Sequence, residues 1–232
     1  MATERFFEHR ADLTAALAAE IARRLTAGVA EHGAASLVAT GGSTPAPLYQ
    51  ALRQIPAPWD RVTVTLSDER WVGLDDPASN EAMVRRSLLQ DHAAPARLVG
   101  LKTDAPSPAL ALAALEPALA ALPHPFDVLV LGMGEDGHVA SLFPHAAELE
   151  TALDAARPQL ACAVNRPDAA GAADRVSLTL RALLDARWIA ILILGQAKLD
   201  AYRRVAGEEV AAAPVQAILK QSNVPVEIWW AP

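Results

Sequence analysis

The sequence predicts an α/β fold in which helices cover both faces of a mostly parallel β-sheet. Two observations lead to this prediction. Segments with strand character alternate with segments of helical periodicity along the chain, and several strands are apolar on both faces, as in "WIAILIL" at 188–194. Parallel strands covered by helices are buried on both faces, so they form continuous apolar runs.

Besides the helical pattern after Pro45, the first half of the chain is expected to supply three helices and two strands. The helices are predicted at 5–27, 79–89 and 109–122, and the strands at 36–40 and 61–70. Apolar side chains recur at helical spacing in the first helix, whereas Val and Leu alternate with Thr and Ser in 61–70. Ser79 or Asn80 is a suitable N-cap for the second helix, and Pro117 predicts a break or kink in the third.

The second half is expected to supply four strands and two helices. The strands are predicted at 126–132, 174–180, 187–195 and 224–230, with a short helix after the first of them and a longer one at 196–205. Residues 165–174 have the composition of a surface loop. Without an internal repeat or a long linker, the pattern predicts one domain over residues 1–232 with a Rossmann-like sheet.

Composition and charge exclude several classes of function. Of the 232 residues, 52% are hydrophobic and 20% are charged, which is enough to bury a sizeable core. A net charge of −7 argues against general nucleic-acid binding but allows a small phosphorylated ligand. The single Cys162 excludes an intrachain disulfide, the N-terminus lacks a secretory signal, and no apolar run reaches the roughly 20 residues of a membrane span. We expect a cytoplasmic protein that is a monomer or a weak homodimer.

Four polar segments follow predicted strands. They are "TGGSTP" at 40–45, "SDERW" at 67–71, "GMGEDGH" at 132–138 and "GQAK" at 195–198. Open parallel sheets bind ligands at the carboxyl ends of their strands. The four segments together therefore predict a ligand site at that edge.

The segment "TGGSTP" is suited to an anion. Its glycines allow a tight turn with exposed N–H groups, and a helical pattern follows Pro45. An ordinary capped turn uses the same residue types, so this segment alone leaves both interpretations open. Lys198 lies in the first turn of a predicted helix, where a cation is unfavourable unless it has an anionic partner. Arg175 is a weaker candidate of the same kind.

The segment "LGMGEDGHVASLFP" at 131–144 contains G-x-G-x-x-G, the pattern of a dinucleotide-binding turn. Glu135 and Asp136 lie between its second and third glycines, where they would repel a pyrophosphate, so we reject this interpretation. The glycines are better explained as positioning Asp136 and His138, because a histidine beside a carboxylate is a suitable general base. Ser141 lacks the G-x-S-x-G motif of serine hydrolases, Cys162 has no activating neighbours, and no metal-ligand spacing is present.

The segment "SDERW" places Asp68, Glu69 and Arg70 at a strand end. A cluster of surface charges is the common explanation. In a functional site, one carboxylate or the guanidinium would point into the cleft, and the sequence does not indicate which one.

Six segments in this order resemble 6-phosphogluconolactonases. They are "TGGSTPAPLYQAL", "SDERWV", "SNEAMVRRSLL", "DVLVLGMGEDGHVASLFP", "RVSLTL" and "LGQAKLDAYRRV", and the resemblance extends from about residue 8 to the C-terminus. It implies hydrolysis of 6-phospho-D-glucono-1,5-lactone to 6-phospho-D-gluconate, in the second step of the pentose phosphate pathway. It also implies no metal, no nucleotide and no other cofactor.

The resemblance implies a role for eight residues. Gly42, Ser43, Thr44, Arg175 and Lys198 would hold the substrate phosphate. His138 would act as the general base, oriented by Asp136, and Arg70 would stabilise the developing oxyanion or else contact the phosphate.

Two alternatives remain open. Glucosamine-6-phosphate deaminases belong to the same superfamily, but their motif has a catalytic glutamate at the position of Phe143 and usually an aromatic residue at the position of Arg70. A non-catalytic phosphosugar sensor would usually carry a DNA-binding helix-turn-helix, which is not evident in this acidic chain.

Overall fold

The computed structural model describes residues 2–168 and 172–232. Its main feature is a seven-stranded sheet in which every pair of neighbouring strands is parallel. In spatial order the strands are β1 (Thr3–Phe6), β10 (Val226–Ala231), β9 (Ile189–Leu194), β6 (Val128–Leu131), β2 (Ala35–Ala39), β3 (Val62–Leu66) and β5 (Arg97–Leu98). All residues of the central strands β2 and β6 are buried.

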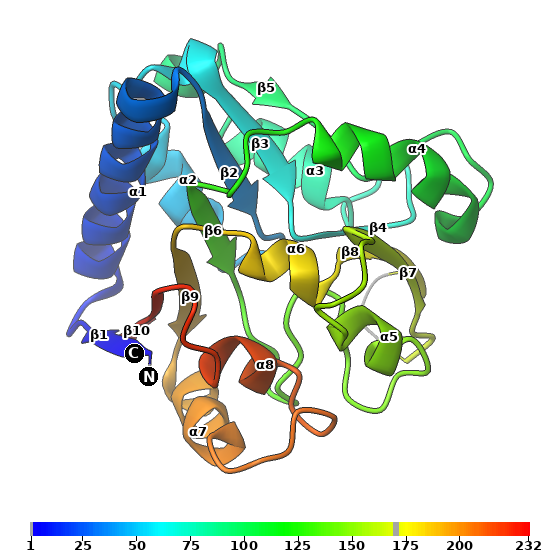
Figure 1. Cartoon of the computed structure of the whole chain (residues 1–232). Helices are drawn as coiled ribbons and strands as arrows, with labels where there is room; N and C mark the ends of the chain where they lie inside the picture. Colours follow the sequence, from blue (N-terminus) through cyan, green and yellow to red (C-terminus); the bar gives the residue numbers. More distant parts are fainter. Residues whose placement is uncertain (1, 169–171) are drawn as a thin grey trace.

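Helices cover the sheet from both sides, which confirms the predicted α/β fold. Figure 1 shows α1 and α2 on one side of the sheet and α6 and α8 on the other. The helices are α1 (Arg10–His32), α2 (Ala46–Leu52), α3 (Asn80–Ser87), α4 (Pro108–Ala120), α5 (Leu149–Leu153), α6 (Leu180–Leu184), α7 (Gln196–Val205) and α8 (Val215–Leu219), with short 3-10 turns at Trp59–Arg61 and Asp91–Ala93. No helix in the described part of the chain is long and apolar enough to span a membrane.

A second, antiparallel sheet of three strands lies beside the main one. Its order is β4 (Asp68–Arg70), β8 (Asp174–Leu178) and β7 (Ala161–Asn165). The prediction of a single strand at 61–70 is therefore wrong, because the chain passes from the seven-stranded sheet to the three-stranded sheet at Ser67. The Ser67 N–H donates to the Ala39 carbonyl, while the Ser67 carbonyl accepts from the Leu178 N–H, both at 2.9 Å. Alternation continues through Ser67, so the pattern could not show this exchange of partners.

Other predicted boundaries also need correction. Residues 3–6 form an edge strand rather than the start of a helix, and α1 extends from Arg10 to His32 and is followed by Gly33, whose φ is +79°. Helix α4 continues past Pro117 because Leu115 and Leu119, on either side of it, are buried in the core. The predicted loop at 165–174 begins in β7 and ends in β8, and residues 169–171 lie outside the described chain.

The arrangement of strands places the predicted motifs at one edge. The arrowheads of β2, β3, β6 and β9 point the same way in Figure 1, and each is followed by one of the four polar segments. Strand β4 follows β3 after a single residue, so the small sheet lies close to the carboxyl ends of the parallel strands. That a single domain covers residues 1–232 stays a prediction.

Candidate active site

A cavity lies at the carboxyl ends of the parallel strands. It receives side chains or backbone from all four polar segments. The polar and charged side chains that line it are those of Thr40, Thr44, Asp68, Arg70, Asn80, His138, Arg175 and Lys198. An adjoining outer hollow shares several of these residues and adds Asp136, Phe143 and Arg166. The predicted convergence at the sheet edge is therefore observed.

His138 and Asp136 form a hydrogen-bonded pair in the loop after β6. Asp136 Oδ1 lies 2.6 Å from His138 Nδ1 and accepts the His138 backbone N–H at 3.1 Å. Partial burial would raise the pKa of Asp136, but the hydrogen bond and charge of His138 outweigh it and lower that pKa to about 2. Ionised Asp136 keeps a proton on Nδ1, so Nε2, which has no hydrogen-bond partner among the described residues, is left as the basic nitrogen.

The glycines of this loop allow the pair to form. A Cβ atom at Gly134 would lie 2.1 Å from His138 Nδ1 and 2.4 Å from Asp136 Oδ1, and Gly137 has a φ of +81°. The ring of Phe143 packs against His138 with 4.5 Å between ring centroids. The glycine spacing therefore supports the Asp136–His138 pair, in agreement with the interpretation of the sequence.

Replacing Gly134 with alanine should disturb the pair without straining the backbone, because no positive φ is required there. We expect Gly134→Ala to lower kcat by about 10- to 100-fold through displacement of His138. Gly207→Ala is the matched control, because a Cβ there has nothing within 4 Å. Steady-state rates with matched thermal unfolding curves test this, and a Gly134→Ala enzyme with wild-type kcat would contradict it.

Three cations line the same hollow as the Asp136–His138 pair. Arg70 in β4 and Arg175 in β8 are register partners in the antiparallel sheet. Burial lowers the pKa of Arg175, the neighbouring charge of Arg70 lowers it further, and Asp68 acts in the opposite direction. Lys198, in the first turn of α7, donates from Nζ to the Met133 carbonyl at 3.0 Å. Two adjacent guanidinium groups and an ammonium group make this cavity suited to an anionic ligand.

The glycine-rich loop reaches the cavity through only part of the predicted set. Gly42 has a φ of +92°, which glycine tolerates best. Thr44 lines the cavity together with Gly41, whereas Gly42 and Ser43 are not among the residues that line it. Ser43 instead lines a neighbouring hollow with Thr44 and Arg10. Of the five residues predicted to hold a phosphate, the structure thus brings Thr44, Arg175 and Lys198 together.

The two carboxylates of "SDERW" have different surroundings. Asp68 lines the cavity and accepts hydrogen bonds from Ser141 Oγ at 2.7 Å and Ser67 Oγ at 2.9 Å. Glu69 is fully buried and accepts the N–H groups of Asn80 and Glu81, each at 2.7 Å. Burial raises the pKa of Glu69 although these bonds act in the opposite direction. Of the three charged residues between which the sequence left the choice open, Asp68 and Arg70 line the cavity and Glu69 does not.

Three residues near the site have contacts that the sequence does not indicate. Ser141 has no nucleophile motif, but it is fully buried and its hydroxyl donates to Asp68. Asn80 is a candidate helix cap by sequence, whereas Ser79 takes that position in the structure. Arg166 lies in the predicted surface loop and lines the outer hollow. No local motif marks these residues, because each reaches the site through a tertiary contact.

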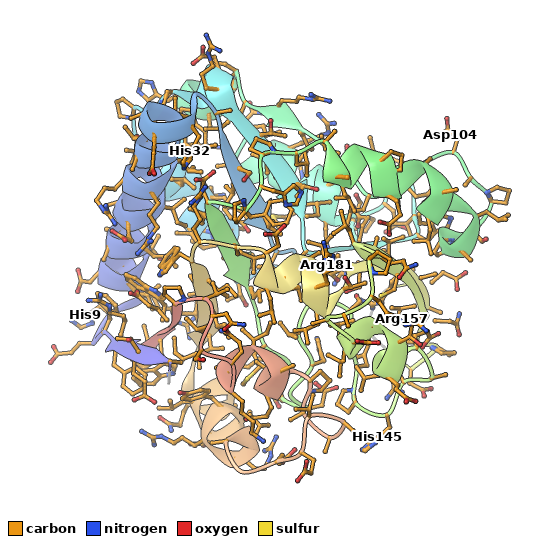
Figure 2. All side chains as sticks on the ribbon, in the orientation of Figure 1. His9, His32, Asp104, His145, Arg157 and Arg181 are labelled. Carbon is orange, nitrogen blue, oxygen red and sulfur yellow. The ribbon has the colours of Figure 1, made fainter. Side chains whose placement is uncertain are left out.

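Other reactive groups lie elsewhere. Figure 2 shows His9, His32 and His145 on the outside of the molecule, and all three are exposed. Burial raises the pKa of Cys162 to about 12, which keeps its thiol protonated and unreactive at neutral pH. Among the described residues, His138 is the histidine that lines the cavity.

Comparison with known proteins identifies the family. A family model described as "Glucosamine-6-phosphate isomerases/6-phosphogluconolactonase" matches residues 8–230. The chain belongs to this family. Within the glucosamine-6-phosphate isomerase/6-phosphogluconolactonase family, the chain is 44% identical to a 6-phosphogluconolactonase from Caulobacter vibrioides, with 97% of this chain and 95% of the relative covered. It is 42% identical to one from Mesorhizobium japonicum, with 97% and 94% covered.

Solved structures of the family agree with this fold. A 6-phosphogluconolactonase from Shewanella baltica superposes with a TM-score of 0.96 at 39% identity, over 100% of this chain and 98% of that one. A monomeric glucosamine-6-phosphate deaminase also superposes, with a TM-score of 0.80 but 18% identity, over 99% and 97%. This second likeness shows that both branches of the family share the fold, so the branch must be argued from the site.

Proposed function

We propose that the protein is a lactone hydrolase that converts 6-phospho-D-glucono-1,5-lactone to 6-phospho-D-gluconate. The observation that carries the proposal is that the hydrogen-bonded Asp136–His138 pair lines the same hollow as Arg70, Arg175 and Lys198. Relatives of about the same length, 42–44% identical to this chain, bear the name of this activity. A base opposite a cluster of cations is suited to adding water to an ester carbonyl in an anionic substrate.

In the proposed reaction, His138 acts on the attacking water. Nε2 takes a proton from water as the oxygen bonds to C1 of the lactone, and Asp136 stabilises the resulting imidazolium through Nδ1. The carbonyl re-forms as the C1–O bond to the ring oxygen breaks, and that oxygen takes the proton from His138 Nε2 to become the C5 hydroxyl, which returns His138 to its neutral form. Arg70 is the donor proposed to stabilise the negative charge on the former carbonyl oxygen.

The phosphate end of the substrate is proposed to lie against Thr44, Arg175 and Lys198. Holding the phosphate fixes the lactone carbonyl beside His138, which lowers the entropic part of the barrier. Gly42 and Ser43 belong to the same loop and keep their proposed role through its backbone N–H groups. A phosphate bound by guanidinium and ammonium groups forms charge-assisted hydrogen bonds.

An assay with freshly prepared lactone tests the proposed function. Formation of 6-phosphogluconate is followed by a coupled dehydrogenase, and the spontaneous hydrolysis rate is subtracted. The proposal expects saturable turnover well above that background. Turnover no faster than background, with ammonia release from glucosamine 6-phosphate, would instead support the deaminase branch. Binding of both phosphosugars without turnover would support a sensor.

The surroundings of Phe143 argue against the deaminase reaction. Phe143 is buried, contacts the His138 ring and lies under the Arg175 guanidinium, whose Cζ is 5.4 Å from the ring centroid. Phe143→Glu restores the carboxylate of the deaminase motif. Because Arg175 and Arg166 both lie over the Phe143 ring, this carboxylate should pair with their guanidinium groups rather than transfer protons. We expect no ammonia release from this variant and a loss of lactonase rate. Phe143→Leu is the control that keeps the site apolar, and ammonia-releasing turnover by Phe143→Glu would contradict the expectation.

A further inference from the structure

We propose that Asn80 is a positioning residue that fixes the Arg70 guanidinium in the cavity, an inference that rests on the proposed role of Arg70. Asn80 is fully buried and its side chain lines the cavity. Its Oδ1 accepts from Arg70 Nη1 at 2.8 Å, and its Nδ2 donates to the Asp68 carbonyl at 2.8 Å. Both ends of the amide are therefore committed to strand β4.

The backbone of Asn80 is held equally firmly. Its N–H donates to Glu69 Oε1 at 2.7 Å, and the same oxygen accepts the Arg70 N–H at 2.7 Å. The other oxygen, Oε2, accepts the Glu81 N–H. Glu69 thus joins β4 to the start of α3, and this junction sets the distance between Asn80 and Arg70.

The glycine-rich loop closes the other side of Asn80. A Cβ atom at Gly41 would lie 1.8 Å from Asn80 Oδ1 and 2.0 Å from its Cγ. Because the amide is hydrogen-bonded at both ends, it could not move aside without releasing Arg70 or Asp68. The absence of a side chain at Gly41 therefore leaves the space that the Asn80 amide occupies. Through this contact, the loop after β2 is coupled to the Arg70 guanidinium in β4.

The chemistry of an amide suits this position. Arg70 Nη1 has two acceptors, Asn80 Oδ1 and the Ala78 carbonyl at 2.7 Å, and both are uncharged. Fixing one end of a planar guanidinium fixes the plane of the whole group. An aspartate could also accept the bond, but its charge would cancel the positive charge that a developing oxyanion needs. Asn80 thus orients the cation and leaves its charge available to the substrate.

A double-mutant cycle on Asn80 and Arg70 tests the inference in the full-length protein. Asn80→Ala should lower kcat by about 10- to 100-fold with little change in KM, because the guanidinium loses its orientation while the phosphate contacts remain. Arg70→Ala should lower kcat at least as much. If Asn80 acts only through Arg70, the double variant should be no slower than Arg70→Ala alone.

Two further measurements separate positioning from folding. Thr179→Ala removes the N-cap of α6, whose Oγ1 accepts the Ala182 N–H away from Asn80 and Arg70, and should lower the melting temperature without changing kcat. Guanidinium ion added to the assay should partly restore Arg70→Ala and should restore the double variant much less, because that variant keeps only the Ala78 carbonyl of the two acceptors. Asn80→Ser, a smaller disturbance, should show the same kcat loss if Asn80→Ala fails to fold.

The outcomes that overturn the inference are distinct from those that overturn the function. Three results would each show that Asn80 does not position Arg70. The first is a wild-type kcat in Asn80→Ala or Asn80→Ser, and the second is equal rescue of Arg70→Ala and the double variant by guanidinium ion. The third is additive losses of kcat in the double-mutant cycle. Wild-type kcat in Arg70→Ala would remove the role of Arg70 and the inference with it. An inactive wild-type protein would overturn the proposed function itself.

Discussion

His138→Ala is expected to lower kcat by about 10²–10⁴-fold, the usual contribution of a positioned general base. KM should change little, because the proposed phosphate contacts of Thr44, Arg175 and Lys198 lie at other residues of the cavity. Background-subtracted initial rates with fresh lactone measure both constants. Phe143→Leu is the control for lost packing, because the Phe143 ring packs against the His138 ring. This variant should lose far less activity than His138→Ala.

The pH dependence distinguishes His138 from Asp136 as the base. Wild-type kcat should fall at acidic pH because imidazolium cannot accept a proton, and His138→Asn should lose this dependence. The pKa of Asp136 is lowered to about 2, so this carboxylate stays ionised throughout the working range and cannot produce an acid limb near neutrality. An asparagine variant that keeps most of the wild-type kcat would show that His138 is structural and would make Asp136 the leading candidate.

Lys198→Ala is expected to raise KM strongly and to lower kcat less. A charge-assisted hydrogen bond contributes roughly 1.5–3 kcal/mol, which corresponds to about 10- to 150-fold in KM. The wild-type lysine also donates to the Met133 carbonyl, so thermal unfolding should be measured beside the kinetics.

The matched control for Lys198 is Lys220→Ala. Lys220 is exposed and donates to the Glu208 carbonyl, away from the residues that line the cavity, so its loss removes the same charge from another place. Its kinetic constants should match those of the wild type. If KM for the lactone is unchanged in Lys198→Ala, Lys198 does not hold the phosphate.

Most of the parallel sheet could be predicted because a strand that is buried on both faces consists of consecutive apolar residues, which are visible in the sequence. The strands predicted at 126–132 and 187–195 contain the continuous apolar runs "VLVL" and "WIAILIL", and β6 and β9 lie within these runs. The exchange of sheets at Ser67 could not be predicted, since the charged residues of β4 follow the alternating residues of β3 without a glycine, a proline or a turn motif between them. Strand β7, "ACAVN", contains two alanines and only one β-branched residue, so strand propensity does not mark it, and its pairing with β8 is a tertiary contact.

The candidate site could be predicted where glycines and charges coincide in one segment. The loop at 131–144 contains both members of the Asp136–His138 pair within three residues, and the structure joins them at 2.6 Å. The environments of Asp68 and Glu69 could not be predicted, because neighbouring residues of a strand point to opposite sides and nothing local says which side is the cavity. Asn80 likewise acquires its contacts only when α3 packs against β4.

The central claim is that this cavity hydrolyses a lactone whose phosphate is held by Arg175, Lys198 and Thr44. The most direct test compares kcat/KM for 6-phospho-D-glucono-1,5-lactone with that for unphosphorylated glucono-1,5-lactone, using one enzyme preparation and subtracting each spontaneous rate. Two or more charge-assisted contacts predict a preference of at least about 100-fold for the phosphorylated lactone. Equal values for the two lactones, or no turnover of either above background, would contradict the account.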